Sequence, residues 1–153
     1  MSDQDGADDI AFRLENFLCF AVYSTNHAFN RVYKPMLDRL GLTYPQYVAM
    51  VALWSGDGLT VGQLGERVLL ETNTLTPLLK RMEVAGLVRR VRDSLDERQV
   101  RIFLTDHGQA LRKQAECLPG AMGTCIEKEG ADLHALTLDL IAVRDKLLAK
   151  IKP

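Results

Sequence analysis

Residues 72–104 constrain the fold most, because the spacing of their apolar side chains changes from helical to extended at one glycine. Between residues 72 and 85 the apolar positions recur three and four apart, which predicts a helix with one buried face (Leu75, Leu78, Leu79 and Met82). Gly86 ends this helix, and LVRRVR (87–92) and QVRIFL (99–104) predict two short strands joined by the turn DSLDER. Proline prefers the first turn of a helix, but the apolar spacing favours a start before Pro77.

Several helices are expected before this stretch. Asp8 or Asp9 can cap a long helix that is apolar on more than one side from Phe12 to Phe29, and such a helix needs two packing partners. That requirement points to a subunit interface. A short helix is expected from Tyr33-Lys-Pro35 to Gly41, another from Thr43-Tyr-Pro45 to Trp54, and a third, TVGQLGERV, capped by Thr60.

Further helices are expected after the strands. Thr105 is a suitable cap for a helix that we expect to be broken at Pro119-Gly120. In the last segment, apolar residues recur at intervals of 3, 4, 3 and 4, the spacing of a short coiled-coil seam (Leu133, Leu136, Leu140, Val143 and Leu147). A helix packed within one chain would show the same stripe, but we favour a subunit interface.

This order of elements predicts a mainly α fold with a small β-hairpin wing, a winged helix-turn-helix flanked by N- and C-terminal dimerisation helices. We expect an acidic flexible arm at 1–8, a DNA-binding region at 32–105, and dimerisation helices at 9–31 and 106–153. Together they form a single domain.

Charge is distributed unevenly along a nearly neutral chain of 153 residues with a net charge of -1. Residues 77–101 hold seven basic and four acidic side chains, which favours a local polyanion site over a solvated charged hairpin. No apolar run reaches the roughly 18 residues of a membrane span, and the acidic start MSDQDGADDI does not resemble a signal peptide. We therefore expect a cytoplasmic protein without a membrane partner.

The predicted helix and wing carry side chains suited to double-stranded DNA. A helix fits the major groove, where Asn73, Thr74 and Thr76 are short enough to reach base edges. Pro77 lies on the same exposed face. Four basic side chains are expected to hold phosphates or to enter the minor groove (Lys80, Arg81, Arg92 and Arg98). An acid in the wing repels phosphate, so the expected role of Asp96 is to orient Arg98.

Cysteines and histidines give no metal-binding pattern. Cys19, Cys117 and Cys125 are odd in number and widely spaced, which argues against a disulfide framework and a zinc site. Three histidines also lack ligand-like spacing (His27, His107 and His134). We therefore expect free thiols, no metal and no cofactor.

The segment LTVGQLGERVLLETNTLTPLLKRMEVAGLVRRVRDSLDERQVRIFLTDHG closely resembles the core of the MarR family of dimeric winged-helix repressors. The stretch TLTPLLKRME and the D-E-R wing tip are its most specific parts, and the resemblance covers nearly all of residues 10–150. It implies a homodimer on a pseudo-palindromic operator, with the flanking helices as the dimer interface.

The segments LENFLCFAVYSTNHAFNRVYKP and LTYPQY resemble the branch of that family that senses organic hydroperoxides. The resemblance implies that Cys19 is oxidised and that tyrosines matching Tyr33 and Tyr44 donate hydrogen bonds to its thiolate. Tyr23, one turn after Cys19, is a third candidate. The two-cysteine subgroup adds a resolving cysteine in the C-terminal region of the partner subunit, for which Cys125 fits best and Cys117 is the fallback.

Three alternatives remain at this point. The first is a MarR-type repressor that is released by a small phenolic or acidic ligand, with the cysteines as bystanders. A thiol peroxidase acting at Cys19 is a second alternative. A wing would have no purpose in such an enzyme, and we expect the protein not to be an enzyme. Buried cysteine in an apolar helix is also commonly inert.

Overall fold

The computed structural model describes residues 12–126 and 132–151. The chain divides into two compact units, Met1–Pro119 and Gly120–Pro153, and each is described by itself. The predicted acidic arm at 1–8 and the expected caps Asp8 and Asp9 lie outside the described residues. Among the helices that are described, none is both long enough and apolar enough to cross a membrane.

The N-terminal helix differs from its prediction at both ends. A 3-10 turn, η1 (Leu14–Asn16), is followed by extended backbone at Phe17, so the helix α2 (Leu18–Asp38) begins six residues later than Phe12. At its other end α2 continues through Pro35, and the separate helix expected from Tyr33 is wrong. Pro35 lacks the N–H that would bond the Arg31 carbonyl, but both residues are exposed, and water can satisfy that carbonyl.

Two capping boxes set the starts of the next helices. Thr43 and Gln46 cap α3 (Tyr44–Ser55), and Thr60 and Gln63 cap α4 (Val61–Val68), each through reciprocal side-chain and backbone bonds. The Thr60 cap was predicted and is confirmed, and α3 begins within Thr43-Tyr-Pro45 as predicted, with Thr43 as its cap. The helix α5 (Thr72–Val84) starts before Pro77, as the apolar spacing indicated.

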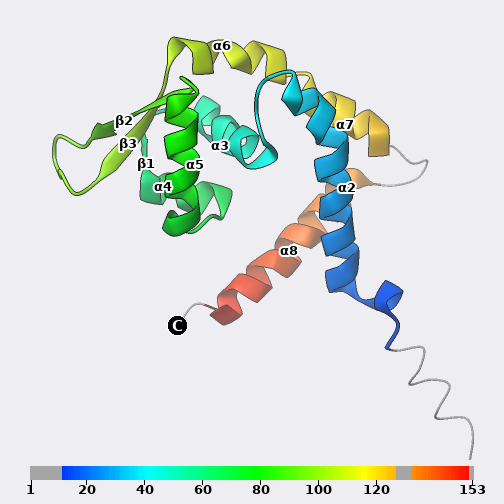
Figure 1. The fold of residues 1–153 in the computed structure, drawn as a ribbon. Helices are drawn as coiled ribbons and strands as arrows, with labels where there is room; N and C mark the ends of the chain where they lie inside the picture. The colour runs from blue at the N-terminus through cyan, green and yellow to red at the C-terminus, as the bar shows by residue number, and fades with distance from the viewer. Residues whose placement is uncertain (1–11, 127–131, 152–153) are drawn as a thin grey trace, which may run out of the picture. The chain divides into compact units, whose positions relative to one another are not determined.

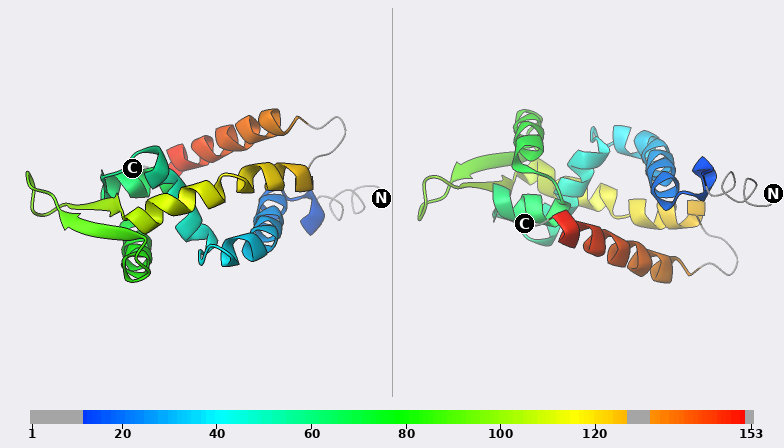
Figure 2. Two further views of the ribbon diagram at one scale, coloured as in Figure 1. Left: turned by 90° about the horizontal axis from the view of Figure 1, so that it is seen from above. Right: turned by 90° about the horizontal axis from the view of Figure 1, so that it is seen from below.

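Three strands form a small antiparallel sheet in the order β1-β3-β2. The predicted hairpin is present as β2 (Val88–Arg92) and β3 (Val100–Leu104), with Val88 opposite Leu104 and Arg92 opposite Val100. It projects beyond the helices of its unit (Figures 1 and 2). The two-residue strand β1 (Leu59–Thr60) was not predicted, because a dipeptide is too short to show alternation.

The core of the first unit lies where α3, α4 and α5 meet the end of α2 and the sheet (Figure 1). All four residues of the predicted apolar face of α5 are buried (Leu75, Leu78, Leu79 and Met82), and they contact the core built around Met50, Leu53, Leu64 and Ile102. The opposite face of α5 remains in solvent. The exposed face of α5 is therefore supported from behind by the packed core.

The first turn of the helix α6 (Asp106–Ala115) is held against this core by close packing and hydrogen bonds. Thr105 caps it by accepting the Gly108 N–H at 3.0 Å, as predicted. Gly108 packs directly against the backbone of Leu87, leaving no room for a Cβ. The indole of Trp54 in α3 donates to the Gly108 carbonyl at 3.0 Å, which ties α3 to α6.

The break that follows α6 lies at Glu116 and Cys117 rather than at Pro119-Gly120. Pro119 instead occupies the first turn of α7 (Leu118–Ile126), where its fixed φ and missing N–H are tolerated. In the second unit, α8 (Leu133–Ile151) contains no buried residue. Four members of its predicted seam are exposed (Leu136, Leu140, Val143 and Leu147).

Candidate nucleic-acid interface and redox cysteines

The exposed face of α5 carries the side chains predicted to meet DNA. Asn73, Thr74 and Pro77 are exposed near its start, and Thr76 is half-buried among them. Lys80 and Arg81 follow on the exposed side one turn later. Because the opposite face of α5 is fixed in the core, these polar groups are held on a rigid element.

In the wing, Asp96 contacts Arg98 as expected from the sequence. One oxygen of Asp96 accepts the Arg98 Nε–H at 3.2 Å and the Arg98 backbone N–H at 3.1 Å. Arg98 is otherwise in solvent, with 92% of its side chain exposed. Arg92 donates to the Glu97 carbonyl at 3.3 Å, which turns it back towards the wing turn. The acid therefore directs one exposed guanidinium without covering it.

Asp93 is a structural residue of the wing that the sequence analysis missed. It is 6% exposed and accepts the backbone N–H groups of Leu95 at 2.7 Å and Asp96 at 3.1 Å, together with Nε–H of Arg101. Arg101 also donates to the Gly58 carbonyl at 2.8 Å, so this pair, the Asp93–Arg101 clamp, ties the wing turn to the loop before β1. An aspartate opening a tight turn was the available signal.

The clamp should make wing stability depend on pH. Hydrogen bonds from Leu95 N–H, Arg101 and Asp96 N–H hold the pKa of Asp93 below its ordinary value. A carboxylate with a lowered folded pKa stabilises the fold above its ordinary pKa, and this stabilisation is lost as pH falls through the lowered value. We expect Asp93→Asn to lower the melting temperature at pH 7, and the difference from wild type to narrow below about pH 4.

Thermal melts of both proteins from neutral to acidic pH check this expectation. Glu97→Gln, a substitution at an exposed carboxylate of the same turn, is the matched control and should change little at any pH. A constant difference between Asp93→Asn and wild type across the range would mean that the charge of Asp93 does not stabilise the wing.

Cys19 lies in the first turn of α2, on an exposed apolar face. Its thiol is free and exposed, and Leu18, Val22 and Tyr23 beside it are also exposed. The helix around Cys19 was predicted to be apolar on more than one side, but a single chain leaves the thiol exposed and does not enclose it in a pocket. The first N–H groups of a helix lack intrahelical partners, and this end of a helix favours negative charge.

The three tyrosines expected near Cys19 lie in two separate parts of the structure. Tyr33, Tyr44 and Tyr47 form one cluster, with ring centroids 5.2 Å apart for Tyr33–Tyr44 and 5.8 Å for Tyr33–Tyr47. Tyr33 stands fourteen residues after Cys19 on the same helix, or about 21 Å at 1.5 Å per residue. One chain therefore does not bring Tyr33 and Tyr44 to its own Cys19.

Tyr23, by contrast, lies one turn from Cys19, and its ring meets His27 edge-on at 4.4 Å. Tyr47 was missed by the sequence analysis, although the spacing in YPQY places it on the same helix face as Tyr44. Burial raises the pKa of Tyr33, with smaller contributions from Tyr47 and Tyr44. Burial likewise raises the pKa of Tyr47, with smaller contributions from Tyr44 and Cys117. Both phenols therefore remain protonated donors near neutral pH.

Cys117 and Cys125 are both exposed free thiols. Cys117 stands between α6 and α7 and lies 3.5 Å from the Gln114 carbonyl, whereas Cys125 is in α7 within the second unit. Within residues 12–126 and 132–151, no cluster of three or more potential metal ligands is found.

Comparison with known proteins identifies the family. The family model described as transcriptional regulator SarA/Rot matches residues 31–114. The organic hydroperoxide resistance transcriptional regulator of Bacillus subtilis (strain 168) is 43% identical over 138 residues, which cover 90% of this chain and 94% of that protein. This chain belongs to the SarA/Rot and MarR-type family of winged-helix transcriptional regulators. Its relatives are regulators rather than enzymes.

Two further members of the SarA/Rot and MarR-type family are similar along most of the chain. HTH-type transcriptional regulator TtmR of Methylorubrum extorquens (strain PA1) is 47% identical over 147 residues, 96% of this chain and 75% of TtmR. The solved structure of reduced AbfR bound to DNA superposes on this chain with a TM-score of 0.80 and is 32% identical to it. The match covers 95% of this chain and 99% of the AbfR chain. A disulfide form of AbfR, a protein of Staphylococcus epidermidis, has a TM-score of 0.66 and 33% identity over the same shares.

Proposed function

We propose that this regulator is a homodimeric repressor that leaves its operator when an organic hydroperoxide oxidises Cys19. The observation that carries the proposal is the exposed Cys19 thiol on an apolar helix face, in a chain 43% identical to the Bacillus subtilis organic hydroperoxide regulator. The apolar neighbours favour organic peroxides over hydrogen peroxide. The relatives reported above are regulators and give no support to the alternative peroxidase role.

The oxidation step needs only the peroxide and two thiols. The Cys19 thiolate attacks one peroxide oxygen, the O–O bond breaks, and the leaving alkoxide takes up a proton to become an alcohol. The sulfur is left as a sulfenic acid. A second cysteine thiol, for which we propose Cys125 with Cys117 as the fallback, then displaces water and closes a disulfide. The disulfide form of AbfR supports chemistry of this kind in the family.

The separation between Cys19 and the tyrosine cluster supports a dimer. Cys19 and Tyr33 are about 21 Å apart along the axis of one helix, so Tyr33 can donate to a Cys19 thiolate only if that thiolate belongs to a second copy. Exposed apolar side chains on α2 and α8 offer the surface that such a copy would bury. We therefore propose residues 9–31 and 106–153 as dimerisation segments and residues 32–105 as the DNA-binding region.

The test uses a duplex obtained by selecting tight-binding DNA from a random pool with the reduced protein. Titration with cumene hydroperoxide should release this duplex at about one equivalent per subunit, as measured by fluorescence anisotropy. A thiol reductant should restore binding. Retention of the DNA under peroxide, combined with its release by a phenolic acid, would replace the proposal with a ligand-released repressor.

The choice of resolving cysteine is a separate prediction. After one equivalent of cumene hydroperoxide, wild type and Cys117→Ser should both give a disulfide-linked dimer on a non-reducing gel, and Cys125→Ser should not. Each variant keeps Cys19 and its surroundings, so intact mass should still show oxidation of Cys19 in all three proteins. A linked dimer in Cys125→Ser that is absent from Cys117→Ser would assign the resolving role to Cys117.

A further inference from the structure

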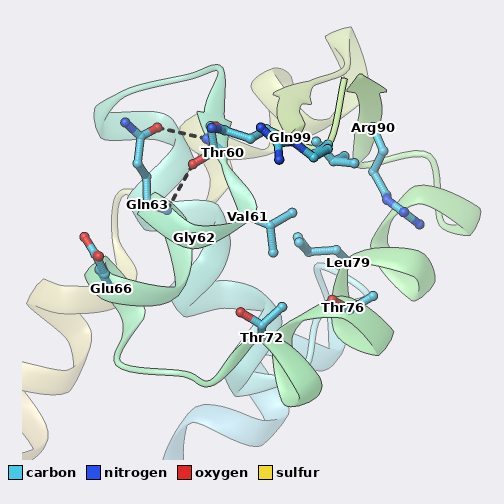
Figure 3. A pocket seen from close by; sticks show the side chains of 12 residues that line it. Thr60, Val61, Gly62, Gln63, Glu66, Thr72, Thr76, Leu79, Arg90 and Gln99 are labelled. Carbon is cyan, nitrogen blue, oxygen red and sulfur yellow. Dashed lines mark hydrogen bonds between the residues drawn. The ribbon is translucent and has the colours of Figure 1, made fainter. Parts of the chain in front are cut away.

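A cavity of about 560 Å³ opens between α4, α5 and the wing (Figure 3). Gly62 at the start of α4 lines it on one side, Thr72 and Thr76 of α5 on another, and Arg90 and Arg98 of the wing on a third. We call this cavity the helix–wing slot. The sequence did not predict a cavity here, and Arg90 was not among the residues predicted to contact DNA.

The slot lies where a strand of bound DNA would have to pass. In a duplex, a sugar-phosphate strand separates the major groove from the minor groove. A helix in the major groove and a wing reaching the minor groove must therefore stand on either side of one strand. Thr76 belongs to the exposed face of α5, Arg98 to the wing, and both line the slot. The strand between the two grooves has to pass the slot.

Arg90 supplies a charge suited to a phosphate in the slot. Its backbone N–H donates to Glu83 at 3.0 Å, and its guanidinium lies 3.8 Å from the second Glu83 oxygen, beyond hydrogen-bond distance. In the part of the chain that the structure describes, no hydrogen bond occupies the guanidinium, so its N–H donors remain available. Glu83 thus steadies Arg90 while leaving its donors for a second anion.

The remaining lining admits a phosphate. Thr72 and Thr76 bring hydroxyl donors, and a Cβ added to Gly62 would meet only Thr60 Oγ1, at 3.9 Å, so the backbone there is open to approach. Glu66 is the one acid of the lining, and Figure 3 shows it at the opposite end from Arg90. The arginine end of the slot is therefore the anion-binding end.

We propose that the helix–wing slot holds a backbone phosphate of duplex DNA and that Arg90 is its principal charged ligand. This contact supplies affinity irrespective of base sequence and places α5 and the wing in register on one strand. The proposal rests on DNA binding by the family and does not depend on peroxide sensing.

Arg89→Gln provides a matched control for Arg90→Gln. Arg89 is the preceding residue of β2, its guanidinium lies over the Phe103 ring at 4.9 Å, and it does not line the slot. The two substitutions remove the same charge from neighbouring positions whose side chains point to opposite faces of the strand. A general electrostatic effect would therefore weaken DNA binding equally in both variants.

The measurement is fluorescence anisotropy with a labelled random-sequence duplex in KCl between about 50 and 200 mM. Arg90→Gln should weaken binding about tenfold. It should also make the fall of log affinity with log KCl concentration shallower, by about 0.9 in slope for each occupied slot. Arg89→Gln should change neither the affinity nor this slope. Equal effects of the two substitutions would overturn the proposal. Because no peroxide is used, that result would leave the proposed sensing function untouched.

Two further measurements keep the test decisive if Arg90→Gln does not fold. Removing the acid of the slot by Glu66→Gln should tighten binding to the same duplex, by roughly twofold, and unchanged or weaker binding would count against the proposal. The other measurement asks whether inorganic phosphate raises the melting temperature of wild type at constant ionic strength. Phosphate stabilisation without an effect of Glu66→Gln on DNA binding would assign the slot to a free anion instead.

Discussion

Cys19→Ser is expected to bind the selected duplex as tightly as wild type and to remain bound when cumene hydroperoxide is added. Serine keeps the size and polarity of the side chain but cannot attack a peroxide at neutral pH. Cys19 is exposed, and two helices, α3 and α4, separate its helix along the chain from α5, whose exposed residues are predicted to contact DNA. The reduced Cys19→Ser protein should therefore bind DNA normally. Wild type should lose roughly tenfold or more in affinity on oxidation, a coupling typical of allosteric regulators.

The matched control for this experiment is Cys117→Ser, which removes another exposed thiol of the same unit. It should release DNA as wild type does. Anisotropy titrations of the three proteins before and after peroxide give the comparison. Release of DNA from Cys19→Ser at the peroxide concentration that releases wild type would eliminate Cys19 as the sensor and with it the proposed function.

The second large effect is expected at Gly108. A Cβ placed there would overlap the carbonyl oxygen of Leu87 and lie 3.0 Å from its carbonyl carbon. That oxygen cannot retreat freely, because it accepts hydrogen bonds from the Thr105 N–H at 3.1 Å and the Thr105 hydroxyl at 3.2 Å. Gly108→Ala should therefore lower the free energy of unfolding by about 3 kcal/mol, as forced overpacking of a core does.

Chemical denaturation of Gly108→Ala measures this loss directly, and the melting temperature should fall by roughly 10 °C. Gly62→Ala is the control, because its Cβ would meet nothing closer than Thr60 Oγ1 at 3.9 Å. The control should unfold within about 1 kcal/mol of wild type. A Gly108→Ala protein as stable as Gly62→Ala would show that α6 does not need its close approach to Leu87.

Features of the fold that depend on local chemistry were predictable from the sequence. The caps Thr43, Thr60 and Thr105 follow from side chains that bond backbone groups within three residues. The buried face of α5 and the two strands of the hairpin likewise come from short-range patterns of residues. The Asp96–Arg98 contact was also predictable, because it joins residues only two apart in one turn.

Features that depend on tertiary surroundings were not predictable in this way. The helix α2 can continue through Pro35 because Arg31, whose carbonyl loses its helical partner there, is exposed to solvent. Residue types alone do not reveal that exposure. The Asp93–Arg101 clamp includes the Gly58 carbonyl, 43 residues from Arg101 along the chain. The distance between Cys19 and the tyrosine cluster became evident only when one continuous helix was found to carry both Cys19 and Tyr33.

The hydrogen bond between Trp54 and the Gly108 carbonyl makes the molecule its own optical probe. The chain has one tryptophan, so all indole fluorescence originates at the contact between α3 and α6. Any loosening of that contact exposes the indole N–H to water and shifts its emission, which can be followed without a dye by exciting at a wavelength that the four tyrosines do not absorb. A change in the packing of α6 against α3 is thus readable from the unlabelled protein.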